Sequence, residues 1–273
     1  MKTATDYSRL AIGVFDSGLG GLSVVKELRK VLPHEDIIYF GDTARLPYGS
    51  KSPETIRRFS KENTKFLLDR GVKAIIVACH SASSVALPEL EREFSLPIIG
   101  VLYPAASAAV KKTRNRKIGV IGTTLTIETG TYEKIIKSLD PKIEIIAKPA
   151  PLLVPLVEEG WVKSPVTLQV LKIYLEPLLK EKIDTLLLGC THYPLLKPAI
   201  RKIIKGRVNL IDASLETAAA TQKLLSEEKL LNPQKCPGRI KFYFSDLSPQ
   251  LYLVAQRFLG FELKDVNRAS LSE

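Results

Sequence analysis

The fold is decided by two apolar stretches that each end in a cysteine, KAIIVAC at residues 73–79 and DTLLLGC at residues 184–190. Such near-continuous apolar runs are typical of strands buried on both faces of a parallel sheet. A second pair is also alike: AIGVFDS at residues 11–17 and KIGVIGT at residues 117–123. The first pair is offset by 111 residues and the second by 106. Two matches in the same order at nearly one offset indicate two related halves.

Apolar, β-rich runs alternate with amphipathic runs along the chain, which predicts α/β architecture with doubly wound parallel sheets. Strands are expected at residues 10–15, 37–40, 74–78, 98–101, 117–121, 143–147, 185–188, 208–211 and 240–244. Helices are expected at residues 22–31, 53–70, 84–94, 132–139, 165–180 and 195–204.

Length and composition are those of a globular protein with room for two domains: 273 residues, 45% hydrophobic and 25% charged. No apolar run reaches the length of about 18 residues that a membrane span needs. The first residues lack an apolar signal region, so we expect a cytoplasmic protein. Three cysteines argue against a disulfide framework. The polar ends, Met1–Ser8 and Asn267–Glu273, are expected to be loose.

The net charge of +11 raises the question of a nucleic-acid partner. The basic residues are spread along the sequence, however, and the densest cluster, residues 111–117, directly precedes a strand-like run. No aromatic residues are interleaved with it to stack on bases. A solvated helix end followed by a loop is the favoured interpretation, and nucleic acid is disfavoured as a partner.

Cys79 and Cys190 are the candidate reactive groups, because each follows a predicted strand and precedes a predicted helix. Ligands of open α/β sheets bind outside the carboxyl ends of the strands, and a helix N-terminus favours the thiolate. Either cysteine alone could be a small buried hydrophobic residue. Their equivalent places in a repeat favour function, and the cysteines would face each other if the two halves do. Cys236 lies in a loop-like stretch and is interpreted as incidental.

A metal site is the next possibility, since histidines accompany both cysteines. Zinc ligands are usually spaced by two to five residues. Here Cys79 is adjacent to His80, and Cys190 is separated from His192 by one residue. Neighbouring side chains cannot easily converge on one ion, so no metal is expected, and a thiol-dependent zinc hydrolase stays a minor alternative.

Two polar turns follow the first two predicted strands. The glycine-rich turn at residues 16–21 matches no phosphate-binding motif, and its glycines would instead let backbone approach a small ligand. Asp16 in this turn either orients a base or caps the following helix. The turn at residues 41–50 offers the Ser50 hydroxyl and backbone N–H groups to a carboxylate.

In this order, the motifs of the chain resemble those of the glutamate racemases in the aspartate/glutamate racemase superfamily. The matching stretches are FDSGLGG at 15–21, GDTARLPYG at 41–49, AC at 78–79, PLVE at 155–158 and GCTHYP at 189–194. The resemblance extends from about residue 11 to residue 259, which is nearly the whole chain.

The resemblance implies two α/β domains related by pseudo-twofold symmetry, with the active site in the cleft between them. We expect the first domain to comprise residues 1–102 and 213–273, and the second to comprise residues 103–212. The implied activity interconverts L- and D-glutamate without metal or pyridoxal phosphate and supplies D-glutamate for peptidoglycan. The small-molecule substrate would be glutamate, no membrane is involved, and the oligomeric state is left open, a homodimer included.

The resemblance also assigns residues by matching position. Cys79 and Cys190 would transfer the proton, Asp16 would assist Cys79, and His192 with Glu158 would assist Cys190. Asp42 would be a supporting acidic residue. The substrate would be held by Asp16, Ser17, Pro47, Tyr48, Gly49, Ser50, His80, Ser81, Thr126, Thr191 and His192.

The chain departs from the family pattern directly after the first cysteine, where His80 and Ser81 replace the usual Asn-Thr. A neutral histidine offers one N–H donor where asparagine offers two. We expect His80 to be mostly neutral at pH 7, and its protonation would raise activity as the pH falls from about 8 toward 6. The replacement leaves two alternatives open: another substrate, such as aspartate, and a non-catalytic amino-acid-binding protein.

Overall fold

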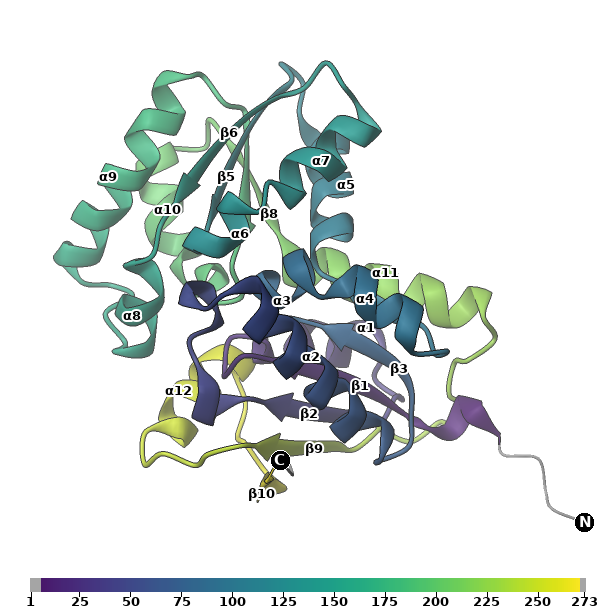
Figure 1. Cartoon of the computed structure of the whole chain (residues 1–273). Coiled ribbons are helices and arrows are strands. Elements are labelled where there is room, and N and C mark those ends of the chain that lie inside the picture. Colours follow the sequence, from purple (N-terminus) through teal and green to yellow (C-terminus); the bar gives the residue numbers. More distant parts are fainter. Residues whose placement is uncertain (1–5, 271–273) are drawn as a thin grey trace, which may run out of the picture.

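A computed structural model describes residues 6–270 of the chain. Its strands form two parallel sheets, ordered β10-β9-β2-β1-β3-β4 and β6-β5-β7-β8 (Figure 1). The strands are β1 (Ala11–Asp16), β2 (Ile37–Gly41), β3 (Val72–Val77), β4 (Ile98–Gly100), β5 (Lys117–Gly122), β6 (Glu144–Pro149), β7 (Thr185–Gly189), β8 (Asn209–Asp212), β9 (Ile240–Phe244) and β10 (Val266–Arg268). The predicted α/β class with parallel sheets is confirmed.

The two halves repeat one topology, as the sequence matches predicted. Strand β1 pairs with β2 and β3, and β3 pairs with β4. In the second sheet, β5 pairs with β6 and β7, and β7 pairs with β8. The order β2-β1-β3-β4 therefore recurs as β6-β5-β7-β8. Assignment of residues 1–102 plus 213–273 and of 103–212 to separate domains stays a prediction.

Helices cover the sheets and join the two halves (Figure 1). They are α1 (Leu22–Val31), α2 (Pro53–Leu68), α3 (His80–Val85), α4 (Leu87–Glu93), α5 (Leu102–Lys112), α6 (Thr124–Glu128), α7 (Thr131–Leu139), α8 (Leu153–Glu158), α9 (Pro165–Lys180), α10 (Lys197–Ile204), α11 (Ala213–Glu227) and α12 (Leu251–Leu259). Short 3-10 helices are η1 (Tyr7–Arg9), η2 (Thr43–Arg45), η3 (Tyr48–Ser50) and η4 (Tyr193–Leu196).

Several sequence predictions of local structure need correction. The single helix predicted at 84–94 is two helices, α3 and α4, and the helix predicted from 195 begins at Lys197, after η4. The ranges of α5, α6, α8, α11 and α12 were not predicted, although the helix end expected at the basic cluster of residues 111–117 is the end of α5 at Lys112. Of the ends expected to be loose, residues 1–5 and 271–273 lie outside the described residues, but Tyr7–Arg9 is helical and Val266–Arg268 is a strand.

The long helices begin where the sequence supplies a cap. The side chains of Ser52 and Ser164 accept hydrogen bonds from backbone N–H groups at the starts of α2 and α9, and proline follows each serine. Both features favour the first helical turn. These signals lie in the sequence itself, so the starts of both helices could be predicted.

The turn after β1 packs directly against the second half. A Cβ atom at Gly20 would lie 2.2 Å from Thr191 Oγ1 and 2.6 Å from His192 Nδ1. Only glycine therefore allows this approach. Helices α1 and α11 also meet between the sheets, where the hydroxyls of Ser23 and Ser214 are 2.9 Å apart.

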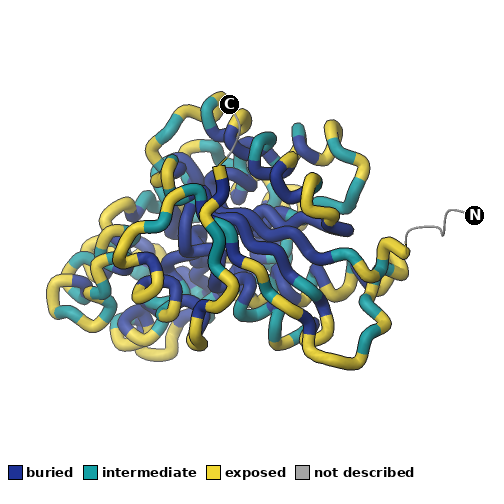
Figure 2. The backbone as a smooth tube through the Cα atoms, turned by 90° about the horizontal axis from the view of Figure 1, so that it is seen from below, coloured by how far each residue is buried: buried dark blue, intermediate teal, exposed yellow. Residues whose placement is uncertain are grey.

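Burial is continuous along the central strands, which Figure 2 shows as dark blue segments inside an exposed periphery. Every residue of β1, β2, β3 and β7 is buried. Within residues 6–270, no helix is long and apolar enough to cross a membrane.

One charged pair lies inside the first half. Lys73 Nζ bonds Glu35, and the two side chains are 0% and 2% exposed. Lys73 also donates to the Ser8 carbonyl at 2.6 Å, and Glu35 accepts from the Asn232 backbone at 2.7 Å. The pair thus ties together four segments that are distant in sequence.

Replacement of Glu35 by glutamine is expected to reduce the free energy of unfolding by about 3 kcal/mol, because it leaves a buried ammonium without its countercharge. The matched control is Glu144→Gln, which removes an exposed partner 3.0 Å from Lys117 and should cost less than about 1 kcal/mol. Urea unfolding measures both. Equal, small losses in the free energy of unfolding would show that the buried pair stabilises the protein no more than the exposed pair does.

Candidate active site

Three chemically active side chains lie at carboxyl ends of parallel strands. Asp16 is the last residue of β1, and Cys79 follows β3 after one residue. Cys190 follows β7 directly. All three are buried, with Asp16 at 0% and each cysteine at 6% exposure. This is the edge at which α/β sheets bind ligands.

A cavity of about 240 Å³ lies between the two halves, and both cysteines line it. It is lined by Ser17, Gly18, Leu46, Pro47, Tyr48, Gly49, Ser50, Cys79, His80, Ser81, Thr123, Thr124, Pro151, Val154, Pro155, Glu158, Cys190, Thr191 and His192. Most of the side chains predicted to bind substrate are thus brought together. Asp16 and Thr126 are not part of the wall and lie one layer behind it.

Cys190 is the first member of a chain of three functional groups. Its sulfur lies 3.8 Å from His192 Nδ1, and His192 Nε2 lies 3.0 Å from Glu158 Oε1. Burial lowers the pKa of His192, but its bonds to Cys190 and Glu158 outweigh burial and raise the pKa to about 10. His192 is therefore a cation at neutral pH, held between the Cys190 sulfur and the Glu158 carboxylate.

Cys79 has the opposite surroundings. Burial and the neighbouring Asp16 carboxylate raise the pKa of the Cys79 thiol to about 12, against weaker opposing bonds from Ala82 N–H and the Ser17 hydroxyl. Burial also raises the pKa of Asp16. Asp16 accepts from Gly18 N–H at 3.0 Å and from the Thr191 hydroxyl at 3.5 Å. At neutral pH Cys79 is accordingly a thiol.

Tyr48 is held from behind the cavity. Its hydroxyl donates to Asp42 and accepts from Asn63 Nδ2 at 3.1 Å. Arg45 Nε bonds the same Asp42 oxygen at 2.7 Å and its guanidinium lies over the Phe59 ring. The Tyr48 hydroxyl is thus occupied by protein groups, so only its ring and backbone are left to meet a ligand. Asp42 lies outside the cavity wall and bonds Tyr48 and Arg45, and its predicted supporting role stays a prediction.

Three hydroxyls form a cluster that spans the two halves. Ser81 Oγ lies 3.0 Å from Thr123 Oγ1 and 3.4 Å from Thr126 Oγ1, and the two threonine oxygens are 2.9 Å apart. Thr123 was missed as a site residue. The repeat contained the signal, because Thr123 stands where Ser17 stands in the first half.

His80 begins α3 and is 3% exposed. Within residues 6–270, neither ring nitrogen has a hydrogen-bond partner, and the ring lies 6.2 Å from that of Tyr132. Burial lowers the pKa of His80 to about 3. The predicted neutral state at pH 7 agrees with this direction, and a rise of activity between pH 8 and 6 can therefore not be assigned to His80.

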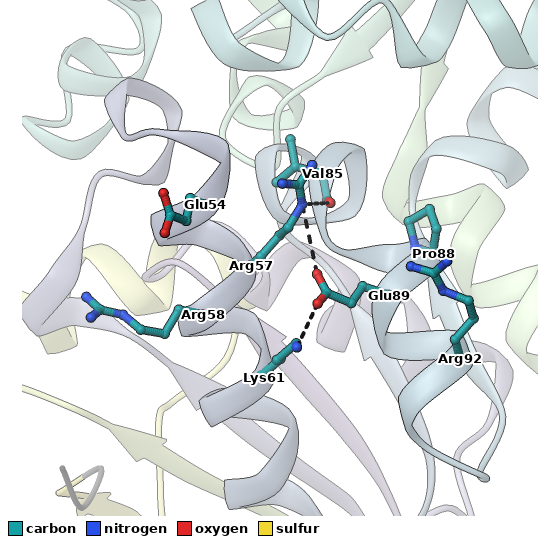
Figure 3. Close-up of a pocket in the computed structure, with 8 residues that line it drawn as sticks. All are labelled: Glu54, Arg57, Arg58, Lys61, Val85, Pro88, Glu89 and Arg92. Carbon is teal, nitrogen blue, oxygen red and sulfur yellow. Dashed lines mark hydrogen bonds and ion pairs between the residues drawn. The ribbon is translucent and has the colours of Figure 1, made fainter.

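Other groups lie apart from this cavity. Cys236 is exposed in a loop, as predicted. Among the described residues, no three histidine, cysteine or acidic side chains lie together in a way that could hold a metal ion. A surface groove between α2 and α4 is lined by six charged residues, two of which share one partner: Lys61 bonds Glu89 at 2.7 Å, and Arg57 lies 3.9 Å from Glu89 (Figure 3).

The two cysteines should differ in charge in the ligand-free protein. On a Cys236→Ser background at pH 7.5, the ultraviolet thiolate absorbance should disappear in Cys190→Ser and persist in Cys79→Ser, because only Cys190 has a neighbouring cation. Glu158→Gln should weaken it, since the carboxylate helps to keep His192 protonated. Loss of the signal in Cys79→Ser would contradict this assignment.

Known proteins share both the sequence and the geometry of this chain. The family model described as Asp/Glu/Hydantoin racemase matches residues 14–221. A curated glutamate racemase of Geobacter metallireducens is 47% identical, over 96% of this chain and 97% of its own length.

Two solved structures are similar over nearly their whole length. A glutamate racemase of Francisella tularensis in complex with D-glutamate is 42% identical with a TM-score of 0.91, covering 97% of this chain and 98% of that one. A glutamate racemase isoform of Bacillus anthracis is 39% identical with a TM-score of 0.93 and the same coverage. With the family model matching most of the chain, this protein belongs to the Asp/Glu/hydantoin racemase family.

Proposed function

We propose that this protein interconverts L- and D-glutamate by proton transfer between Cys190 and Cys79, and that it supplies D-glutamate for peptidoglycan. The observation that carries the proposal is the pair of cysteines at equivalent strand ends in one cavity wall. The family membership and the names of the relatives at 39–47% identity support it.

Inversion at one carbon without a cofactor needs two groups on opposite faces of that carbon. In one direction the Cys190 thiolate removes the α-proton, and the electron pair of the broken C–H bond moves into the α-carboxylate. The Cys79 thiol then gives its proton to the other face and becomes the thiolate. The reverse direction exchanges the two roles, and Asp16 is placed to assist Cys79 as His192 assists Cys190.

The cavity suits a small dicarboxylic amino acid. Among the described residues, no lysine or arginine lines it, so carboxylates are met by hydroxyl and N–H donors and by the His192 imidazolium in the wall. Donors include the side chains of Ser17, Ser50 and Thr191. Such fixed donors in a dry site stabilise the charge that develops on the α-carboxylate in the transition state.

The two-thiol mechanism is tested in D₂O. The wild-type protein should exchange the α-proton of L- and D-glutamate and racemise both, including after chelation of metals. Cys79→Ala and Cys190→Ala should each lower turnover by at least about 10²- to 10⁴-fold, because each removes one proton-transfer group. The matched control is Cys236→Ala, which should leave turnover unchanged.

Serine at either site should impair one direction more than the other, since each cysteine meets one enantiomer. Near-normal turnover in both alanine variants would refute the mechanism. Turnover of aspartate above that of glutamate would favour the altered-substrate alternative, and binding of either amino acid without α-proton exchange would favour a non-catalytic binding protein.

The effect of His80 and Ser81, which replace the Asn-Thr usual in the family, can be tested by reversing the replacement. His80→Asn with Ser81→Thr should raise kcat/KM for glutamate by about ten- to a hundred-fold, the value of one hydrogen bond to a charged group. The pH profiles of wild type and variant between pH 6 and 8 should have the same shape, because His80 is neutral throughout. Lower kcat/KM in the double variant would show that the histidine is adapted to its site.

A further inference from the structure

The positive charge of this protein is gathered in space at one end of the second sheet. The last turns of α5, α7, α9 and α10 and the loops after them meet there, because β5 to β8 are parallel and start at the same edge. These segments, residues 109–116, 136–143, 177–184 and 201–208, are called the basic edge. They contain twelve basic and three acidic residues, and all twelve basic residues are exposed. In Figure 1 the starts of β5 and β6 lie at the top, away from the first half.

The fold does not require this excess. Lysine and arginine near helix C-termini complement the helix dipole, and that demand exists in both halves of the repeat. The corresponding segments of the first sheet, residues 7–10, 28–36, 65–71, 90–97, 224–239 and 256–265, contain eleven basic and nine acidic residues. The net charge is thus +9 at one edge and +2 at its structural counterpart.

Few of these charges are neutralised by the protein itself. Asp184 is committed to the loop, since it accepts from the Thr113 hydroxyl at 2.6 Å and from the backbone N–H of Asn115 at 2.8 Å. Asp140 lies 3.8 Å from Arg116. Within residues 6–270, none of the eight lysines of the basic edge has a carboxylate within 4.0 Å. Lys61 provides a contrast, because it bonds Glu89 at 2.7 Å (Figure 3) and also Glu93 at 2.9 Å.

The basic edge also has an apolar component. A recess of about 370 Å³ is lined by Leu179, Ile203 and Ile204 and is bordered by Lys182, Lys205 and Arg207. The basic edge has no aromatic residue that could stack on a base. Its one carboxamide, Asn115, is occupied by the Lys182 carbonyl and the Lys117 N–H. These features suit phosphate-bearing headgroups over an apolar layer better than base recognition.

Against the expectation that no membrane is involved, we propose that the basic edge docks this protein on the surface of a bilayer rich in anionic lipid. Binding is electrostatic and reversible, since lysines attract anionic headgroups individually and salt screens the attraction. The starts of the strands contact the bilayer, while their opposite ends carry Cys190. The cavity between the halves therefore stays open to solvent when the protein is docked. The proposal does not depend on the identity of the substrate.

Sedimentation with vesicles tests the proposal on the full chain. Wild type should bind vesicles of three parts phosphatidylcholine to one part phosphatidylglycerol and should not bind phosphatidylcholine alone, and high salt should release it. The edge variant is Lys182→Gln, Lys205→Gln and Arg207→Gln. The control variant, Arg58→Gln, Arg92→Gln and Lys229→Gln, removes the same charge from the first half. Lys205 and Lys229 are further matched by positive φ angles of 48° and 57°.

The edge variant should bind the anionic vesicles about ten-fold more weakly than wild type or worse, and the control variant should lose less than about two-fold. Both should keep wild-type glutamate turnover, which separates this test from the proposed activity. Equal losses would show that only net charge matters and would overturn the proposal. Absent vesicle binding, or random duplex DNA bound more tightly than vesicles at the same salt, would overturn it as well.

Discussion

Removal of two thiols from water is the constraint on which this site depends. A buried thiol resists ionisation unless a cation lies beside it. Parallel strands buried on both faces place both cysteines in such a dry position, at the carboxyl ends of β3 and β7. His192 supplies a cation at one of them, and Asp16 supplies an acid at the other. The duplicated fold thus gives the two cysteines different chemical environments. A two-base proton transfer requires such a difference, because one group must accept a proton while the other holds one.

The sequence was sufficient for the features that follow from local patterns. Buried strands are recognisable in the sequence as apolar runs. Ser52 and Ser164 are recognisable as N-caps, which identify the starts of their helices. Only the end of α5, at the basic cluster, was predicted; its body was missed because the buried face consists mostly of small residues without a strong polar face opposite: Leu102, Ala105, Ala106 and Ala109. The motif pattern brought Cys79, Cys190 and His192 into one site, but it could not tell that the Tyr48 hydroxyl points to Asp42 instead of the cavity.

The grouping of charged residues in space also could not be predicted from the sequence. Basic residues that look scattered along the chain converge because four parallel strands start at one edge. The two ends of one strand therefore lie in different surroundings. Strand β7 begins among the exposed lysines of the basic edge, and Cys190 follows its other end. The two ends differ in solvation, so salt screens the charges of the basic edge while the His192–Cys190 pair, at 5% and 6% exposure, is shielded from it.

Contacts between the two halves affect the hydration of Cys79 and therefore its pKa. The Ser81–Thr123 hydrogen bond and the approach of Gly20 to Thr191 both cross from one half to the other. Separation of the halves would break these contacts and let more water reach Cys79. Hydration would remove the largest cause of its raised pKa, which is burial. Cys79 therefore holds its proton most firmly while its surroundings are dry, and a bound substrate that displaces water from the cavity maintains that state.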